Sequence, residues 1–495
     1  MTTTTINRRD FIKSAAPGIA LLSLPGMARG QTTRTRLEWQ QFKTTTQYAS
    51  FLYAVRTMKA NTNAASASSW RYWVNVHVNF CPHGMPYFLA WHRGYLYYLE
   101  QRMRTVSGNT TLTLPYWDYY RYPRIPSEFT DRATGNPLYV SRVGTNVYNA
   151  LDLAPFASTV YNFQTGKSNA FEPKFESAPH NPVHNIIGGN MATMESPLDP
   201  IFFLHHANVD RLWHAWALPD GKGIPRTANP YSTINSDPYW SGSFTYASGL
   251  TMPRYLAYYP GWLSYDYASS SKPTSLPPQS QSSPIIRVQA QRGQILNRPL
   301  RGDFATTPGR AIGQNRRAVG GAKDVTLDER SVSALIPVQP ADTAALQGIA
   351  TTAPGAKNAA GPYQSVRLVL DDIKITGAGR NGGFFYNVYL NLPQSGDATA
   401  SRQRYFVGTL GAFELAGVAH HGSATLVYPA TEVLASFDQS ALREIAVSLV
   451  RVSGENAPRG QVLHIGEMRI ELSTDAPFEA DAPVGKSSAN CYCDK

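Results

Sequence analysis

The sequence predicts a mainly α-helical domain followed by an antiparallel β-sandwich. Its 495 residues exceed one ordinary hydrophobic core, so two or three domains are expected. In the first half of the chain apolar residues recur at helical spacing, whereas from about residue 360 they alternate with a period of two. Between these regions lies a Ser/Pro-rich and then Arg/Gly-rich stretch, which is typical of a linker.

Changes in composition set the expected boundaries. The helical domain should cover residues 31–267, the linker 268–339, the β-sandwich 340–475 and a flexible tail 476–495. Residues 1–30 contain a pair of arginines followed by a short apolar run and small residues, the order found in a twin-arginine export signal. We therefore expect an exported protein, periplasmic or secreted. A basic amphipathic helix is the alternative for this segment.

Charge and cysteine content exclude several classes of protein. The formal net charge is +11, with excess Arg between about 285 and 330, but these residues are interleaved with Gly, Pro and Gln. A solvated linker explains this pattern better than a surface for nucleic acid or membrane. No apolar run after the N-terminal segment has the length of a membrane span. Three cysteines are too few for a disulfide scaffold.

The helical domain is predicted in four parts. Residues 37–60 carry apolar positions at helical spacing and predict one packed helix. Residues 111–119 are apolar and aromatic, as expected of core packing. Residues 121–175 are rich in Pro, Asn, Gly and aromatics and predict long connecting loops. An aromatic segment at 255–267 closes the domain.

The β-sandwich is predicted from alternating apolar residues. Short strands separated by Gly and Pro turns favour an antiparallel arrangement. The predicted strands are residues 366–375, 384–392, 404–410, 445–452 and 462–472.

Histidines concentrate in two stretches of the helical domain. In the first, Pro82 and Gly84 break any helix between His77 and His83, so a loop must present His83, and a new helix opens at His92.

In the second stretch, His180 and His184 are four residues apart, so on a helix their rings project from one face. A further helix, with Asp199 as its N-cap and Pro200 in its first turn, carries His206. Three histidines in each stretch indicate two metal ions. Neutral imidazoles without a carboxylate suit copper better than magnesium, calcium or manganese.

Two segments carry a family resemblance. The first is Phe88-Leu-Ala-Trp-His-Arg-Gly-Tyr-Leu, and the second is Asp199-Pro-Ile-Phe-Phe-Leu-His-His-Ala-Asn-Val-Asp-Arg-Leu-Trp. They resemble the two copper-binding signatures of the tyrosinase and polyphenol oxidase family, the type-3 copper proteins. The resemblance covers residues 35–267 and extends more weakly toward 470. Residues 386–391 resemble a strand motif of the C-terminal domain of plant polyphenol oxidases.

The resemblance implies a four-helix bundle around a dicopper site, with dioxygen as co-substrate. His205 would then lie behind the six ligand histidines named next, without binding a copper ion itself. The implied ligands are His77, His83 and His92 for one copper, and His180, His184 and His206 for the other.

The resemblance also implies a covalent link at Cys81. In fungal tyrosinases and molluscan haemocyanins a Cys at this spacing forms a thioether to the copper-binding His, here His83. The alternative is a small buried thiol.

Four other residues receive roles from the resemblance. Glu176 and Asn181 would hold a water that takes the proton of a phenol, the step that separates monophenol from diphenol chemistry. The alternative for Glu176 is a solvated carboxylate at a helix start. Asn185 and Thr193 would control substrate access. Asn185 replaces an Arg of some bacterial tyrosinases, which weakens the expectation of a preference for tyrosine, and Thr193 is a small gate that favours phenol hydroxylation.

The expected protein is a copper enzyme that hydroxylates small monophenols at the ortho position and oxidises o-diphenols to o-quinones. A diphenol-only catechol oxidase and a haemocyanin-like oxygen carrier are the alternatives, and self-association stays open. The β-sandwich should act as a lid that keeps the enzyme latent; the rival is a domain that only binds surfaces or aids folding. Cys491 and Cys493 are expected to deliver copper, with a disulfide as the alternative.

Overall fold

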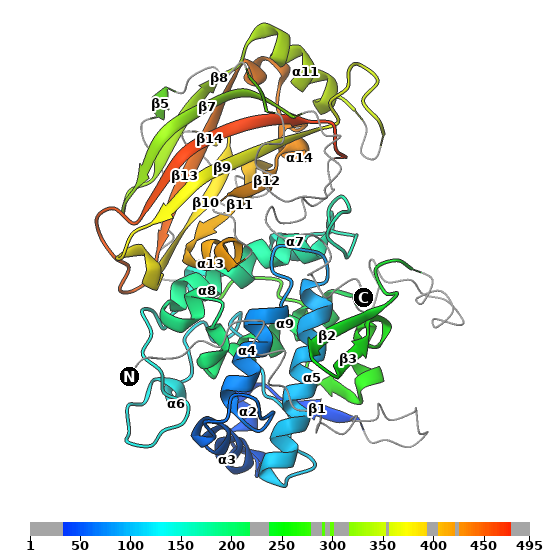
Figure 1. Ribbon diagram of the computed structural model, residues 1–495, viewed down its shortest axis with the longest axis vertical. Helices are drawn as coiled ribbons and strands as arrows, with labels where there is room; N and C mark the ends of the chain where they lie inside the picture. Colours follow the sequence, from blue (N-terminus) through cyan, green and yellow to red (C-terminus); the bar gives the residue numbers. More distant parts are fainter. Residues whose placement is uncertain are drawn as a thin grey trace.

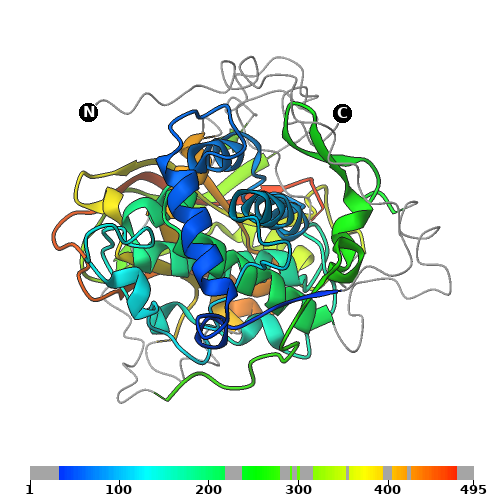
Figure 2. The same cartoon turned by 90° about the horizontal axis from the view of Figure 1, so that it is seen from below.

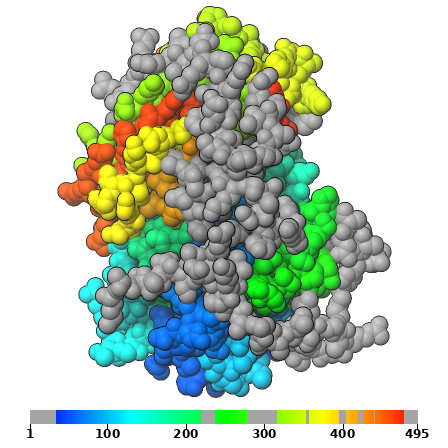
Figure 3. Space-filling view, in the orientation of Figure 1, coloured from blue at the N-terminus to red at the C-terminus, as the bar shows by residue number. Residues whose placement is uncertain are grey.

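The computed structural model describes residues 33–217, 237–278, 290–292, 298–300, 316–352, 356–393, 404–420 and 425–476. It has a helical domain at one end and a β-sandwich at the other (Figure 1). Figure 2 views the molecule from its helical end, and Figure 3 shows the sandwich, light green to red, above the helical domain, blue to green. The expected fold class, a helical domain followed by antiparallel sheets, is confirmed. The expected signal at 1–30 and most of the tail lie outside the described residues.

The helical domain is built around four helices that carry the histidines. They are α4 (Trp70–Phe80), α5 (Phe88–Ser107), α8 (Asn181–Ile187) and α9 (Ile201–Ala217). Its other elements include β1 (Arg34–Arg36), α2 (Trp39–Phe42), α3 (Gln47–Ala60), α6 (Ser127–Thr130), α7 (Phe171–Phe175), η3 (Glu176–His180), β2 (Ser243–Ala247), β3 (Leu250–Pro253) and β4 (Tyr265–Tyr267). Every residue of α9 is buried, which makes it the central helix of the domain.

The single helix predicted over 37–60 is wrong, because α2 and α3 are separated by a turn at 43–46. The hydroxyl groups of Thr44 and Thr45 donate to the carbonyl oxygens of Gln41 and Phe42. Such local hydrogen bonds compete with the helical backbone and end the first helix. The segment predicted as loops, 121–175, is mostly irregular but contains the short helix α6 and ends in α7; the buried aromatic segment at 111–119 is confirmed.

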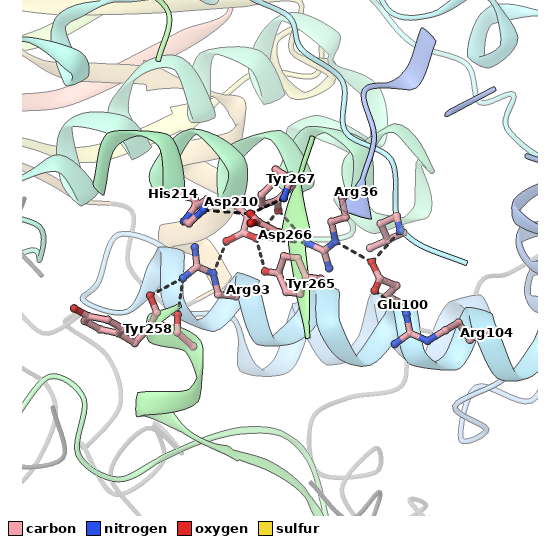
Figure 4. A network of polar contacts seen from close by, with 12 residues as sticks. Arg36, Arg93, Glu100, Arg104, Asp210, His214, Tyr258, Tyr265, Asp266 and Tyr267 are labelled. Carbon is pink, nitrogen blue, oxygen red and sulfur yellow. Dashed lines mark hydrogen bonds and ion pairs between the residues drawn. The ribbon is translucent and has the colours of Figure 1, made fainter. Parts of the chain in front are cut away.

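A buried charge network ties the ends of the domain to its central helices (Figure 4). Strands β1 and β4 pair in parallel, which places Arg36 of β1 beside Tyr267 of β4. Arg36 pairs with Glu100 of α5 at 2.8 Å and, at 3.5 Å, with Asp210 of α9. Arg93 of α5 approaches the same Asp210 at 2.6 Å. The network therefore fixes α5 against α9, the two helices that carry His92 and His206.

The β-sandwich consists of two five-stranded sheets, with strand orders β11-β10-β13-β8-β5 and β12-β9-β14-β7-β6. All strand pairs are antiparallel except β5 with β8. The elements are β5 (Ala290–Arg292), β6 (Arg298–Leu300), β7 (Arg316–Leu327), β8 (Val332–Pro337), α11 (Pro340–Ala350), β9 (Ser365–Ile375), β10 (Phe384–Leu390), β11 (Phe406–Gly411), α13 (Ala412–His420), β12 (Leu426–Pro429), α14 (Thr431–Leu434), β13 (Glu444–Ser453) and β14 (Leu463–Ser473).

The sandwich begins earlier than the predicted boundary at residue 340. Strands β5 to β8 all lie inside 268–339, the range assigned to the linker. Strand β7 has small and charged residues where a strand usually has alternating large apolar ones. Its sequence is Arg-Arg-Ala-Val-Gly-Gly-Ala-Lys-Asp-Val-Thr-Leu. Pairing with β14 along its length makes this segment a strand despite its composition.

The two domains meet at the end of the sandwich that carries β10, β11 and α13 (Figure 1). This end packs on α8 and η3 of the helical domain. A second contact is made by the loop after β13, where Glu455 pairs with Arg124 at 2.8 Å and accepts hydrogen bonds from the backbone and side chain of Thr145. No helix among the described residues is both long and apolar enough to cross a membrane.

Candidate dicopper site

The four helices bring the six predicted ligands into two groups. His77 lies on α4 and His92 on α5, while His83 lies in the loop between them, as the helix breakers predicted. His180 ends η3, His184 lies on α8 and His206 on α9. Asp199 accepts from the backbone N–H of Ile201, so the predicted cap at the start of α9 is present. All six side chains are buried.

Oxygen atoms orient four of the six rings through Nδ1. His180 Nδ1 donates to Asn181 Oδ1 at 2.8 Å. The other three bonds run from His77 to the Met194 carbonyl (2.8 Å), from His92 to the Phe88 carbonyl (2.8 Å) and from His184 to the Met191 carbonyl (2.7 Å). With the proton on Nδ1, the lone pair is on Nε2, the arrangement that metal-binding histidines need.

In the second group the Nε2 atoms converge on one another. His206 Nε2 lies 3.3 Å from His180 Nε2 and 3.4 Å from His184 Nε2. Three lone pairs this close repel unless a cation lies between them. In the first group one ligand atom from each of His77, His83 and His92 also lies within 4.8 Å of the others.

Burial keeps four of these imidazoles neutral. It lowers the pKa of His92 and of His184 from 6.5 to about 3. The pKa values of His180 and His206 lie well below 6.5 for the same reason, with neighbouring histidines adding to the shift. Neutral imidazoles are ready to bind a metal without first losing a proton.

The two groups pack directly against each other. The rings of His92 and His206 stack with centroids 4.2 Å apart and 20° between planes. Phe88 packs edge-on against His92 and His180, and Phe202 lies 4.1 Å from the His206 ring and 5.0 Å from the His77 ring. Each phenylalanine touches both groups, so the two metal positions are held side by side in apolar surroundings.

His205 lies closer to the second group than expected. It shares the 4.8 Å cluster with His180, His184 and His206, and its ring stacks on His180 with centroids 5.3 Å apart. Among the described residues, neither of its ring nitrogens has a hydrogen-bond partner. His206 is still the better ligand candidate, because its Nε2 approaches both other Nε2 atoms.

Cys81 lies inside the first group. Its sulfur is 3.6 Å from His83 Nε2 and 3.5 Å from His92 Nε2. Burial and the nearby Glu176 raise the pKa of the thiol well above its ordinary value, so it is protonated. These are distances between unbonded atoms, and the thioether to His83 stays a prediction.

Glu176 is buried beside the first group. Its Oε1 accepts from the Gly84 backbone N–H at 2.8 Å. Burial raises its pKa to about 8, and the charges of Glu172 and Glu414 add to this effect. The alternative of a solvated carboxylate is therefore wrong. Asn181 has a role that the sequence did not predict, since its Oδ1 orients the ring of His180. The shared water of Glu176 and Asn181 stays a prediction.

A residue of the sandwich fills the mouth of the site. The ring of Phe413, in the first turn of α13, stacks on His184 with centroids 4.0 Å apart and 15° between planes. It also packs edge-on against His83 at 5.3 Å and His180 at 5.6 Å. Phe413 therefore touches both histidine groups. Nothing in the local sequence distinguishes it, because its position depends on how the two domains pack.

Asn185 anchors the segment that carries Phe413. Its Oδ1 accepts from the Phe413 backbone N–H at 2.9 Å, and its Nδ2 donates to Glu414 Oε2 at 2.7 Å. Its backbone carbonyl accepts from the Gly383 N–H at 2.7 Å. A Cβ atom at Gly411 would lie 2.5 Å from the Asn185 amide, so glycine is required for this approach. Asn185 thus contacts the segment of the sandwich that packs on the histidines, and its control of substrate access stays a prediction.

Thr193 was expected to control substrate access, and this role stays a prediction. Its hydroxyl donates to the Asn190 carbonyl and accepts from the Glu195 N–H, so it stabilises its own turn. The neighbouring Met191 and Met194 contribute more to the site, through the carbonyl groups that orient His184 and His77. Sequence gave no sign of this, because any residue supplies a backbone carbonyl.

The fold and the paired histidine groups define a dinuclear metalloprotein. The family model described as the common central domain of tyrosinase matches residues 49–152 and 136–218. This part of the chain is therefore similar to the central domain of tyrosinases, and its two histidine-rich groups are consistent with a dicopper centre.

Two curated relatives match the same region. Tyrosinase HcTyr1 of Hahella sp. (strain CCB-MM4) is 33% identical over 184 residues, which are 30% of this chain and 40% of that protein. A G-type haemocyanin of Enteroctopus dofleini is 34% identical over 175 residues, 29% of this chain and 6% of that protein. The matched region thus spans less than half of either relative.

One solved structure is similar over almost the whole chain. The structure of latent apple tyrosinase covers 91% of this chain and 98% of its own, with 18% identity and a TM-score of 0.50. This similarity concerns the fold alone: a helical domain followed by a β-sandwich.

Proposed function

We propose that the protein is a latent copper phenol oxidase. In the active form it hydroxylates small monophenols at the ortho position and oxidises o-diphenols to o-quinones. The overall reactions balance as monophenol plus dioxygen giving o-quinone and water, and two diphenols plus dioxygen giving two o-quinones and two waters. Two copper ions bound by the six histidines would supply the redox chemistry with dioxygen.

The single observation that carries the proposal is the stack of Phe413 on His184. The site admits an aromatic ring of the size of a phenol, in contact with histidines of both groups. The ring belongs to the sandwich, and the proposal is that this domain moves away from the helical one in the active form. A site that accepts an aromatic ring suits an oxidase of aromatic substrates. Because a removable side chain closes the site, the enzyme would be latent until that side chain is displaced.

The residues of the chain then have distinct roles. Phe88 and Phe202 exclude water from the ring-binding space, and Asn181 holds His180 in its metal-binding orientation. Glu176 is the candidate base for the phenol proton. Displacing the sandwich removes Glu414, one of the charges that raise the pKa of Glu176, and so favours the carboxylate form that can accept a proton.

Two alternatives use the same site. A diphenol-only catechol oxidase would oxidise catechol but not hydroxylate a monophenol, and an oxygen carrier like the haemocyanin relatives would bind oxygen reversibly. The test is oxygen uptake by the copper-loaded protein with catechol and p-cresol, before and after limited proteolysis. We expect uptake with both substrates, and more after cleavage. Uptake with catechol alone would support the first alternative, and reversible binding without turnover the second.

Export and copper loading remain proposals of the same account. A twin-arginine signal at 1–30 would move a protein already folded around copper, and the pair Cys491 and Cys493 would capture Cu(I) for the site. The test is a variant with both cysteines changed to serine. If it loads copper at the wild-type rate and level, the delivery role is excluded.

A further inference from the structure

We propose that the open site recognises tyrosine within a polypeptide, and prefers a tyrosine that is followed by an acidic residue. This inference rests on the proposed function and names a substrate class for it. Its basis is that the lid occupies the site as a substrate would. The lid presents an aromatic residue, its backbone N–H and the carboxyl group of the next residue to one helical-domain side chain, Asn185.

The aromatic part of the lid meets the histidines directly. Phe413 lies on His184 at 4.0 Å and is buried in the interface. Because tyrosine differs from phenylalanine by one hydroxyl group, a tyrosine side chain fits the same space. The ring reaches the site from an ordinary peptide backbone, at the start of α13. A polypeptide segment, the start of α13, therefore packs over the histidines in this structure.

The polar part of the lid fits the two ends of the Asn185 amide. Oδ1 accepts from the N–H of the aromatic residue, a group that every peptide bond of tyrosine offers. Nδ2 donates to the carboxyl group of the following residue, Glu414. Asn185 is fully buried and its backbone is held by Gly383, so its amide is fixed in the bound orientation.

This pairing distinguishes between residues that follow the tyrosine. An amide N–H donates to a carboxylate but cannot pair with an ammonium group. Removing a hydrogen bond to a charged group costs about tenfold or more in affinity. A tyrosine followed by glutamate should therefore be oxidised with a higher kcat/KM than one followed by lysine.

The chemistry is the proposed reaction applied to a peptide side chain. One oxygen atom of dioxygen enters the ring carbon ortho to the hydroxyl group, and the other leaves as water. The electrons come from the ring, which ends as an o-quinone, so no other reductant is needed.

The main test uses the protein carrying Phe413→Gly and Glu414→Gly, which removes the two side chains that resemble the substrate, opened by limited proteolysis so that the backbone at 411–413 leaves Asn185. Oxygen uptake is measured with p-cresol and with two blocked peptides, acetyl-Gly-Tyr-Glu-Gly-amide and acetyl-Gly-Tyr-Lys-Gly-amide. We expect the glutamate peptide to exceed the lysine peptide about tenfold in kcat/KM. Adding Asn185→Leu, which keeps the shape but loses both amide groups, should bring the ratio close to one.

The outcomes separate this inference from the proposed function. Two results would overturn the peptide inference alone, provided that p-cresol is turned over. One is an equal kcat/KM for the two peptides, and the other is a ratio of their kcat/KM values that Asn185→Leu leaves unchanged. No turnover of p-cresol or catechol by any opened form would overturn the proposed function itself.

A second variant tests the position of the ring without opening the lid. Phe413→Tyr places a phenol at the site on the protein's own chain, and Phe406→Tyr is the matched control on β11. After copper loading in air, mass spectrometry of the fragments should show added oxygen at position 413 and none at 406. The inference would be contradicted if the phenol at position 413 stays unmodified although the opened form of the same preparation oxidises p-cresol.

Discussion

The Phe413 ring of the sandwich lies face to face on the His184 ring of the helical domain, with centroids 4.0 Å apart. The contact joins the two domains at a candidate metal ligand. Asn185, the next residue along α8, holds the same segment through both ends of its amide. The sandwich thus contacts the site through two consecutive residues, His184 and Asn185, which the proposed closure of the lid would use.

The second interdomain contact makes closure of the lid sensitive to acid. Burial alone would raise the pKa of Glu455, but hydrogen bonds from Thr145 and the Arg124 guanidinium hold it below its ordinary 4.5. A carboxyl whose pKa is lowered in the closed form stabilises closure above 4.5, and this contribution is lost as pH falls through the lowered pKa. Acid should therefore favour opening.

The measurement is the rate of protease cleavage between the domains as a function of pH. Wild type should show faster cleavage below pH 4.5, and Glu455→Gln should lose this acid-dependent increase. The same acid dependence in Glu455→Gln would assign it to another group. Because the Arg124–Glu455 pair is largely exposed, with side-chain exposures of 66% and 35%, added salt should also weaken closure.

The ligand assignment is tested by a pair of adjacent histidines. His206→Ala should bind one copper fewer than wild type and lose turnover, because its Nε2 faces both His180 and His184. His205→Ala should keep both copper ions. Copper content measured by atomic absorption decides between them. If the His205 variant loses copper and the His206 variant keeps it, the assignment is reversed.

Glu176 should matter more for monophenols than for diphenols. Glu176→Gln keeps the bond from the Gly84 N–H and the size of the side chain, but it cannot accept a proton. We expect activity on p-cresol to fall by about 10²-fold or more, the usual contribution of a general base, with a smaller loss on catechol. Equal losses on the two substrates would exclude the base role.

The buried network around Asp210 should dominate the stability of the helical domain. Burial alone would raise the pKa of Asp210, but the charges of Arg93 and Arg36 keep it below 3.8. Asp210→Asn removes a charge partner from both arginines, and breaking a buried pair costs about 3–5 kcal/mol. Urea denaturation measures this loss. Asp266→Asn, which removes a partly exposed partner of His214, should change stability by only about 0.5 kcal/mol.

The parts of the fold that the sequence predicts are those with local signals. Helix breakers placed His83 in a loop, the Asp199 cap placed the start of α9, and period-two segments placed the long strands. Strands β7 and β8 were missed because pairing with distant strands, and not local composition, makes them extended. For the same reason a protease cut between 316 and 337 would damage the sandwich as well as separate it.

The candidate site divides in the same way. The resemblance of two histidine-bearing segments to the copper signatures gave six candidate ligands, and the structure brings these side chains together in two groups. Phe413, and the carbonyl groups of Met191 and Met194, were not predicted. The first depends on how two domains pack, and the others are backbone atoms whose role appears only when the turn lies against His77 and His184.

The most direct test of the account compares wild type with Phe413→Ala. Both are loaded with copper at full length, and oxygen uptake is measured with 4-tert-butylcatechol. The lost aromatic contact is worth about 0.5–1.5 kcal/mol, which corresponds to a rise in kcat/KM of up to about tenfold. Phe406→Ala, on β11, should behave as wild type. Equal kcat/KM for wild type and Phe413→Ala, at equal copper content, would contradict a lid that closes the site through Phe413.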